Sequence, residues 1–183
     1  MLTARRRLFR GYLDSQLGRI NLLFNTQGEL IRLDLGLPEH FDPWPQYREA
    51  TADQQVATAA CTQLGEYFEG TRREFDLPIA PLGSAFLKQA WALLRSIPYG
   101  TTSTYGALAK AMSKPSSARA IGMANAVNPV SIIVPCHRVI AATGHLTGYS
   151  GGLDKKRSLL MLEAKYTRAD LACGARWMNA PST

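Results

Sequence analysis

Residues 131–140 read SIIVPCHRVI: an apolar run, a proline, and then a cysteine followed directly by a histidine and an arginine. The pattern predicts a short buried run that Pro135 ends, with Cys136 at a rigid turn. A cysteine is a nucleophile only as a thiolate, so Cys136 needs a nearby base, and the base needs a group that orients it. His137 is the first candidate for that base. The alternatives are a core cysteine and a structural histidine.

A carboxylate that can hold the histidine lies in the last amphipathic segment. Residues 154–165 read DKKRSLLMLEAK and predict a helix on which Glu163 lies among leucines. A carboxylate in that setting is well placed to hydrogen-bond an imidazole. Because adjacent side chains of an extended segment point in opposite directions, we expect a water molecule to bridge His137 and Cys136.

The segments before this stretch predict short helices. Apolar residues at helical spacing predict a helix over 84–97, a second from an N-cap at Ser103 to Met112, and a third over 116–127 that Pro115 opens. Two short helices joined by a tight turn are typical of a helix-turn-helix.

The third of these helices has an unusual surface. Residues 116–126 read SSARAIGMANA, small residues with Arg119 as the only charge. Small residues suit close approach to the DNA minor groove, and they suit tight packing on another helix equally well. Arg119 is a candidate to contact a phosphate or to fill the gap left by an extruded base.

The first half of the chain predicts a small sheet domain. Apolar runs at about 8–12, 19–25 and 29–35 predict an antiparallel meander, and a helix from about 47 to 68 is expected to cover one face of it. The predicted helix buries Val56, Ala59, Ala60, Leu64 and Phe68 and contains Cys61, which we interpret as an inert small hydrophobe. LPIAPLGS at 77–84 is typical of a linker. We therefore expect an N-terminal domain over 1–80 and a C-terminal domain over 81–183.

Charge separates the two halves. The net charge of +7 divides into −2 through Gly83 and +9 from Ser84 onward. A basic half favours a polyanion partner such as DNA, and the alternative is a solvated basic surface. No stretch reaches the roughly 20 apolar residues of a membrane span, and the basic start of the chain lacks the apolar core of a secretory signal. The three cysteines, an odd number, favour a reducing compartment, so we expect the cytoplasm.

Metal and cofactor sites are not indicated. Cys136, His137 and His145 are possible ligands, but adjacent ligands without a CxxC pair make a poor tetrahedral site. Neither GxGxxG nor GxxxxGK[ST] occurs in the sequence. We expect no metal and no cofactor.

NPVSIIVPCHRVI at 128–140, followed by TGYSGG at 147–152, resembles the signature of the O6-alkylguanine-DNA alkyltransferases. These repair proteins transfer an alkyl group from damaged guanine to their own cysteine, once. The resemblance runs from residue 84 to about 165 and includes IPYGTTSTYGALA and SARAIGMANAVNP. It implies an α+β fold: a small ribonuclease-H-like N-terminal α/β domain and a mainly helical C-terminal domain with a winged helix-turn-helix. SAFLKQAW at 84–91 departs from the family pattern, and no counterpart follows Lys165.

The resemblance implies roles for the reactive residues. Cys136 is the alkyl acceptor, His137 the water-linked base and Glu163 its partner. Asn128 is the hinge between the helix-turn-helix and the active site. Tyr105 hydrogen-bonds the flipped base and helps to protonate the departing guanine.

The resemblance also implies contacts to DNA. Arg119 fills the vacated base stack and Ala120 lies beside it on the DNA-binding helix. The carbonyls of Val139 and Cys136 accept from the guanine amino group. The loop with Tyr149 and Ser150 closes on the base, and Ser150 bonds its O6 side. The partner is double-stranded DNA, bound as a monomer through the minor groove with the alkylated base flipped; O4-alkylthymine is a further possible substrate.

Other classes of function stay open on the sequence. A non-repairing relative senses alkylated bases without accepting the group, but such relatives replace the cysteine that Cys136 provides. A helix-turn-helix regulator prefers one DNA sequence, and a cysteine hydrolase turns over an ester or amide.

Overall fold

The computed structural model describes residues 7–35, 45–113 and 115–167. The chain divides into two compact units, Met1–Leu82 and Gly83–Thr183. The start of the basic N-terminal segment, Cys173 and the tail beyond 167 lie outside the described residues. Within them, no helix is long and apolar enough to cross a membrane.

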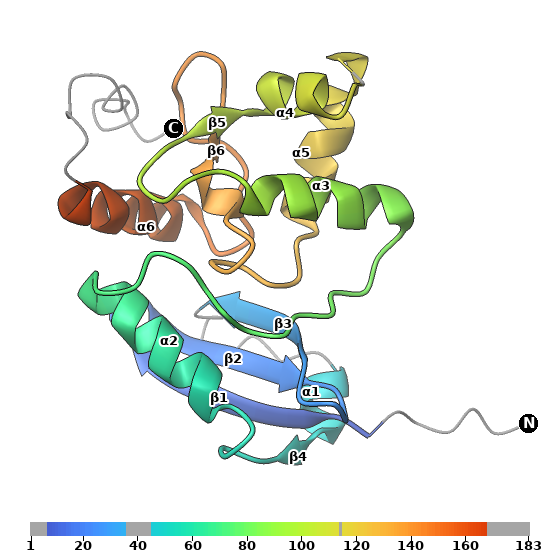
Figure 1. The fold of residues 1–183 in the computed structure, drawn as a ribbon, viewed down its shortest axis with the longest axis vertical. Helices are drawn as coiled ribbons and strands as arrows, with labels where there is room; N and C mark the ends of the chain where they lie inside the picture. The colour runs from blue at the N-terminus through green and yellow to red at the C-terminus, as the bar shows by residue number, and fades with distance from the viewer. Residues whose placement is uncertain (1–6, 36–44, 114, 168–183) are drawn as a thin grey trace, which may run out of the picture. The chain divides into compact units, whose positions relative to one another are not determined.

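The first unit contains the expected antiparallel meander. Strands β1 (Phe9–Ser15), β2 (Gly18–Phe24) and β3 (Leu30–Leu35) pair in sequence order, and a two-residue turn joins the first two. The sheet order is β3-β2-β1-β4, because the short β4 (Thr51–Ala52) adds in parallel to β1 (Figure 1). The sequence did not indicate this edge strand.

The single helix expected from 47 to 68 is wrong in its first half. The structure has α1 (Pro45–Glu49), then β4, and only then α2 (Thr58–Glu69). The Oδ1 atom of Asp53 accepts the N–H groups of Gln55 and Val56, a local turn that competes with helix. The backbone before this turn pairs with the edge of the sheet, because Thr51 N and Asp53 N donate hydrogen bonds to the carbonyls of residues 8 and 10.

Helix α2 covers one face of the sheet (Figure 1). It buries Ala60, Leu64 and Tyr67, whereas Ala59 and Phe68, which were expected to be buried, are exposed and half-buried. Below it the sheet contributes a buried row that includes Ile20 and Leu22. The buried residues of α2 form the ordinary apolar face of an amphipathic helix.

The second unit opens with the predicted helices. Helix α3 (Ala85–Arg95) begins at Ser84, whose hydroxyl accepts from Leu87 N at 3.3 Å. Helix α4 (Tyr105–Ala111) is capped by Thr104 and not by Ser103, since Ala107 N donates to the Thr104 hydroxyl at 3.2 Å.

Ser103 and the capping residue Thr104 form a short strand just before α4. Strand β5 (Ser103–Thr104) pairs in parallel with β6 (Val139–Ile140). The pairing fixes the start of α4 beside the segment that follows Cys136.

The helix-turn-helix expected from the sequence is present. A single 3-10 turn, η1 (Pro115–Ser117), leads into α5 (Ala118–Ala126), and α4 and α5 pack on each other. Trp91 Nε1 donates to the Ala124 carbonyl at 2.9 Å and ties α3 to α5. Helix α6 (Leu153–Tyr166) is the last helix among the residues that the structure describes (Figure 1).

Glycine variants test the contact between α2 and the sheet. A Cβ on Gly11 would overlap the Cβ of Ala57, whereas a Cβ on Gly65 in α2 meets nothing within 4 Å. We expect Gly11→Ala to lower the free energy of unfolding by about 1–3 kcal/mol through overpacking. Gly65→Ala should raise it by about 0.5–1 kcal/mol because alanine favours helix. Urea denaturation measures both, and a Gly11→Ala protein as stable as the parent would contradict this packing.

Candidate active site

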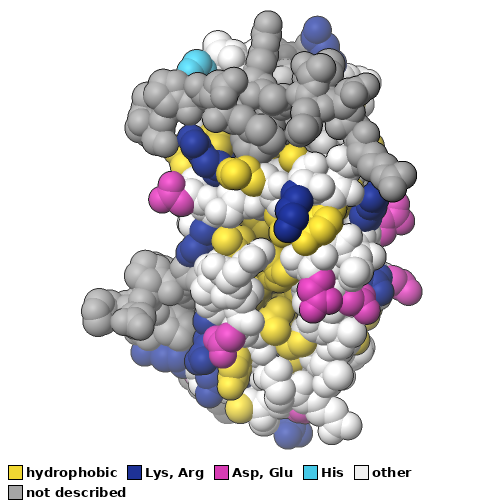
Figure 2. Space-filling view, turned by 90° about the vertical axis from the view of Figure 1, so that its left-hand side faces the viewer, with side chains coloured by type: hydrophobic (Ala, Val, Ile, Leu, Met, Phe, Trp, Pro, Cys, Tyr) yellow, Lys and Arg dark blue, Asp and Glu magenta, His cyan; other side chains and the backbone are white. Residues whose placement is uncertain are grey.

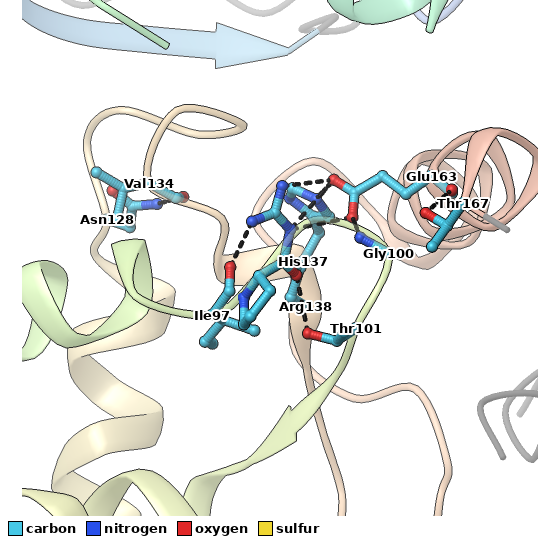
Figure 3. A network of polar contacts seen from close by, with 10 residues as sticks. Ile97, Gly100, Thr101, Asn128, Val134, His137, Arg138, Glu163 and Thr167 are labelled. Atoms are coloured by element: carbon cyan, nitrogen blue, oxygen red, sulfur yellow. Dashed lines mark hydrogen bonds and ion pairs between the residues drawn. The ribbon is translucent and has the colours of Figure 1, made fainter. Parts of the chain in front are cut away.

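The chain reverses direction just before Cys136. Residues 132–134 are buried as expected, but they form a turn instead of an extended run, and Ile132 has φ 69°. A β-branched residue in the left-handed region costs about 1–3 kcal/mol and persists only where its surroundings enforce it. Asn128 enforces it: its Oδ1 accepts from Val130 N at 3.1 Å and its Nδ2 donates to the Val134 carbonyl at 2.8 Å (Figure 3).

Cys136 begins the 3-10 turn η2 (Cys136–Arg138) and is 1% exposed. Its backbone is therefore not extended, and the expected alternation of side chains does not apply. Burial raises the pKa of the thiol, while the side chains of Asn128, Lys156 and Ser131 oppose that rise. The thiol stays protonated at neutral pH until a base takes its proton.

His137 is held by Glu163, as the sequence predicted. Its Nε2 lies 2.9 Å from Glu163 Oε1, and both side chains are fully buried (Figure 3). Glu163 reaches this point from α6. The pair joins the turn that carries the cysteine to α6.

The same carboxylate binds further donors. Arg138 donates from Nε to Glu163 Oε2 at 3.0 Å and from Nη2 to Oε1 at 2.9 Å, and Gly100 N donates to Oε2 at 2.9 Å. The Nη1 atom of Arg138 also reaches the Ile97 carbonyl at 2.6 Å (Figure 3). Glu163 thus connects α6, η2 and the loop after α3.

The charges around Glu163 determine the protonation state of His137. Burial alone raises the pKa of the Glu163 carboxyl, but His137 and Arg138 outweigh burial and bring this pKa to about 2. Burial also lowers the pKa of His137, although Glu163 opposes this. The carboxylate is therefore ionised at pH 7 beside a neutral imidazole, and Arg138 is the partner that keeps its charge.

This arrangement selects one tautomer of His137. A carboxylate only accepts hydrogen bonds, so the Nε2 of the neutral imidazole carries the hydrogen and Nδ1 keeps a lone pair. Nδ1 is buried and has no hydrogen-bond partner among the residues that the structure describes. The ring is ready to accept a proton at Nδ1.

The predicted substrate contacts lie around this buried cluster. Tyr105 begins α4, and its hydroxyl donates to the Thr147 carbonyl at 3.4 Å. The Val139 carbonyl, in β6, accepts from Lys156 Nζ at 2.6 Å and keeps a second lone pair for another donor. In the following loop, Tyr149 is half-buried and Ser150 is exposed.

The Cys136 carbonyl is the less available of the two predicted acceptors. It already accepts from Val139 N and, at 3.4 Å, from Asn125 Nδ2. This observation favours the Val139 carbonyl as the acceptor for a substrate amino group.

The predicted DNA contacts lie apart from the cluster, on the surface of α5. Arg119 and Ala120 are both exposed. The opposite face of the helix buries Ile121, Ala124 and Asn125. The structure therefore brings together the reactive residues and leaves this pair on the outside.

Sequence reasoning missed several residues of the cluster. Arg138 lies in residues 131–140, but the sequence assigned no role to it, and it did not single out Lys156 or Asn125. A signal for Lys156 existed: it lies seven residues before Glu163, and residues at that spacing share one face of a helix.

The third metal-ligand candidate lies in a surface loop. His145 is exposed, and its Nδ1 lies 3.0 Å from the Thr143 hydroxyl. In the described part of the chain, no group of three or more histidine, cysteine, aspartate or glutamate side chains is placed to hold a metal ion.

Comparison with known proteins gives one consistent result. Residues 8–81 match the family described as "6-O-methylguanine DNA methyltransferase, ribonuclease-like domain", and residues 85–165 match its "DNA binding domain". A methylated-DNA–protein-cysteine methyltransferase of Mycolicibacterium paratuberculosis is 48% identical over 121 residues, 66% of this chain and 73% of that protein. One from Methanosarcina acetivorans is 54% identical over 111 residues, 61% of this chain and 71% of its own.

Solved structures agree with the sequence matches. The O6-methylguanine methyltransferase of Mycobacterium tuberculosis is 40% identical with a TM-score of 0.81, over 90% of this chain and 98% of that chain. The M. tuberculosis OGT in complex with DNA is 39% identical with a TM-score of 0.76, over 90% and 97%. These matches confirm the expected fold, a ribonuclease-like sheet domain followed by a helical DNA-binding domain.

Removing the charge of Glu163 tests the buried ion pair. We expect Glu163→Gln to lower the free energy of unfolding by about 3–5 kcal/mol, because it leaves the Arg138 guanidinium buried without a counter-ion. Glu66→Gln is the matched control: Glu66 pairs with Arg72 at a more exposed site, and its loss should cost about 1 kcal/mol or less. Equal effects of the two changes on urea denaturation would contradict the role given to Glu163.

Acid titration of stability tests the same carboxylate. The pKa of Glu163 falls from 4.5 to about 2 in the folded state. A lowered pKa stabilises the folded protein fully above about pH 4.5, and this contribution is lost as pH falls toward 2. The parent protein should therefore lose stability more steeply over this range than Glu163→Gln. Parallel curves in chemical denaturation from pH 5 downward would argue that Glu163 is not the group that titrates.

Proposed function

The chain belongs to the 6-O-methylguanine DNA methyltransferase family, and we propose that it repairs DNA by moving the alkyl group of O6-alkylguanine to the sulfur of Cys136. The product is a thioether on the protein and an unmodified guanine in the DNA. Because that C–S bond is stable, each molecule reacts once. Relatives with 48% and 54% identity carry the name methylated-DNA–protein-cysteine methyltransferase, which supports this reaction.

One observation carries the proposal: a buried cysteine directly precedes a histidine whose proton state is fixed by a buried carboxylate. Cys136 and His137 are adjacent, and Glu163 accepts the Nε2 hydrogen of His137 at 2.9 Å. This is the general arrangement of nucleophile, base and orienting group. It gives the thiol a route for losing its proton inside an apolar core.

The proton moves first. The thiol proton passes through a bridging water to Nδ1 of His137, and the new imidazolium is stabilised by Glu163. The thiolate then attacks the alkyl carbon, and the bond between that carbon and O6 breaks with its electron pair going to guanine. Tyr105 supplies a proton to the departing base, and the thiol proton held by His137 then passes through solvent to the Tyr105 phenolate, which restores both side chains. The net change is one alkyl group exchanged for one proton.

The substrate contacts follow from the groups around the thiol. The Val139 carbonyl accepts from the guanine amino group, and the loop of Tyr149 and Ser150 closes on the base with Ser150 toward O6. Asn128 maintains the turn that presents Cys136, which makes it the mechanical connection between α5 and the reacting sulfur. An O4-alkylthymine presents similar chemistry and is a further substrate.

The second unit binds DNA through α4 and α5. Its helix-turn-helix exposes Arg119 and Ala120, and its small residues permit close approach to the narrow minor groove. Figure 2 shows basic, acidic and apolar side chains on the one face of the molecule that it presents. A match that includes a DNA complex supports DNA as the partner.

The target base has to leave the duplex because its O6 substituent cannot reach a buried thiol otherwise. Flipping costs a few kcal/mol. We assign Arg119 to the space that the base leaves, where an inserted side chain maintains the stack. The protein acts as a monomer, and the residues from 81 onward form the DNA-binding and alkyl-acceptor domain. The need for a reduced thiol favours the cytoplasm.

Mass spectrometry of the reacted protein tests the proposal. After incubation with a duplex that contains O6-methylguanine, the peptide with Cys136 should be heavier by one CH2 group. Cys136→Ser should gain nothing, while Cys61→Ser, which removes the half-buried cysteine of α2, should react like the parent.

The other outcomes separate the alternatives. Binding to the alkylated duplex without transfer would indicate a non-repairing sensor of damage. Repeated turnover of an ester would indicate a hydrolase, and preference for a DNA sequence without regard to damage would indicate a regulator. Each of these results overturns alkyl transfer to Cys136.

A further inference from the structure

Asn125 is a buried asparagine with one half of its amide unpaired. It lies on α5 and is 4% exposed. Its Nδ2 donates to the Cys136 carbonyl at 3.4 Å, whereas its Oδ1 is buried and has no hydrogen-bond partner among the residues that the structure describes. A buried acceptor without a donor costs free energy, and most buried polar groups in proteins are paired. The retention of this amide inside the protein therefore needs an explanation.

The backbone of the reactive turn sets the orientation of the amide. A carbonyl only accepts hydrogen bonds, so the NH2 group of Asn125 faces the Cys136 carbonyl and Oδ1 is the end of the amide that is left over. The same carbonyl accepts from Val139 N. The side chain of Asn125 and the backbone of Val139 therefore meet at one oxygen atom beside the reacting cysteine.

The inner face of α5 also reaches the other side of the site. Gly122 precedes Asn125 by three residues, and residues at that spacing are neighbours on one face of a helix. A Cβ on Gly122 would lie 3.9 Å from two atoms of the Tyr105 ring. This face of α5 thus contacts Tyr105 at one turn and the Cys136 carbonyl at the next. Asn125 lies among the groups to which we assign the flipped base.

The hydrogens of a guanine amino group explain the unpaired atom. An amino group has two hydrogens, and both need acceptors when the base is buried. The Val139 carbonyl has a lone pair for one of them, because Lys156 uses only the other. The Cys136 carbonyl already accepts from two donors. Oδ1 of Asn125 is the acceptor that remains for the second hydrogen.

We propose that Asn125 is a specificity-determining residue, whose Oδ1 accepts a hydrogen from the 2-amino group of the alkylated guanine while Nδ2 stays on the Cys136 carbonyl. The inference rests on the proposed function, since it concerns the base that enters that site. A thymine presents a carbonyl oxygen where guanine has this amino group, so two acceptors would face each other. The site therefore favours O6-alkylguanine over O4-alkylthymine.

Two duplexes that differ by a single amino group test the inference. One contains O6-methylguanine and the other contains O6-methylhypoxanthine, which lacks the 2-amino group. With the protein in excess, the rate of methylation of Cys136 is measured on each, and the ratio of the two rates gives the preference for the amino group. We expect Asn125→Leu, which has nearly the same shape without polar atoms, to reduce this preference about three- to tenfold, the effect of one hydrogen bond. The loss should come from slower transfer from O6-methylguanine.

Matched variants separate recognition from packing. Asn21→Leu makes the same substitution on β2 of the first unit and should change neither rate. Asn125→Ala removes the amide by truncation and should reduce the preference in the same direction, so the test does not depend on how leucine packs. The melting temperature of Asn125→Leu should equal or exceed that of the parent, because the change removes an unpaired buried acceptor. An asparagine kept for structure alone would lower the melting temperature and leave the preference unchanged.

The remaining outcomes are distinct. A preference for the amino group that is unchanged in both variants, or absent from the parent, would overturn the inference. Equal slowing of transfer from both duplexes would overturn it too, since the amide would then act on the cysteine turn and not on the base. A parent protein that accepts no methyl group from the O6-methylguanine duplex would overturn the proposed function instead.

Discussion

The C-terminal unit depends on one buried carboxylate. Glu163 accepts hydrogen bonds from His137, Arg138 and Gly100 N, and these donors come from the cysteine turn and from the loop after α3. Without this acceptor, the guanidinium of Arg138 would be buried without a counter-ion and the imidazole of His137 without its hydrogen-bond partner, which proteins rarely tolerate. Within residues 83–113 and 115–167, Asp154 and Glu163 are the acidic residues, so this basic unit uses one of its scarce carboxylates internally. The interaction that stabilises the unit also sets the protonation state of His137, the proposed catalytic base.

The position of the Cys136 sulfur depends on backbone geometry as well as on the buried charges. Asn128 bridges the turn in which Ile132 takes a left-handed conformation, and η2 follows at once. The pairing of β5 with β6 then brings the start of α4, and with it Tyr105, to the same site. The helix-turn-helix is therefore attached directly to the reactive turn. In the proposed function, DNA binding by α5 and the presentation of Cys136 are therefore connected through residues 127–136.

Much of this was predictable from the sequence, and the failures have physical causes. Local patterns were enough for the meander, the helix-turn-helix and the pairing of His137 with Glu163. They failed where strand pairing or side-chain hydrogen bonds outweighed local propensity. The strand β4 interrupted an expected helix, and the hydrogen bonds of Asn128 made the apolar run before Pro135 a turn. Periodicity identifies a buried position but not its charge partner, which is why Lys156 was overlooked. The resemblance to a known family supplied the substrate, since no pattern of charges or apolar residues names a damaged base.

The tautomer of His137 is the most direct test of the account, and nitrogen NMR of the imidazole measures it. With Glu163 ionised and Arg138 charged, Nε2 should carry the hydrogen and Nδ1 should give the shift of an unprotonated ring nitrogen throughout the neutral pH range. Such a ring can take the thiol proton. An imidazolium with both nitrogens protonated at neutral pH, or a neutral ring with its hydrogen on Nδ1, would contradict the mechanism at its first step.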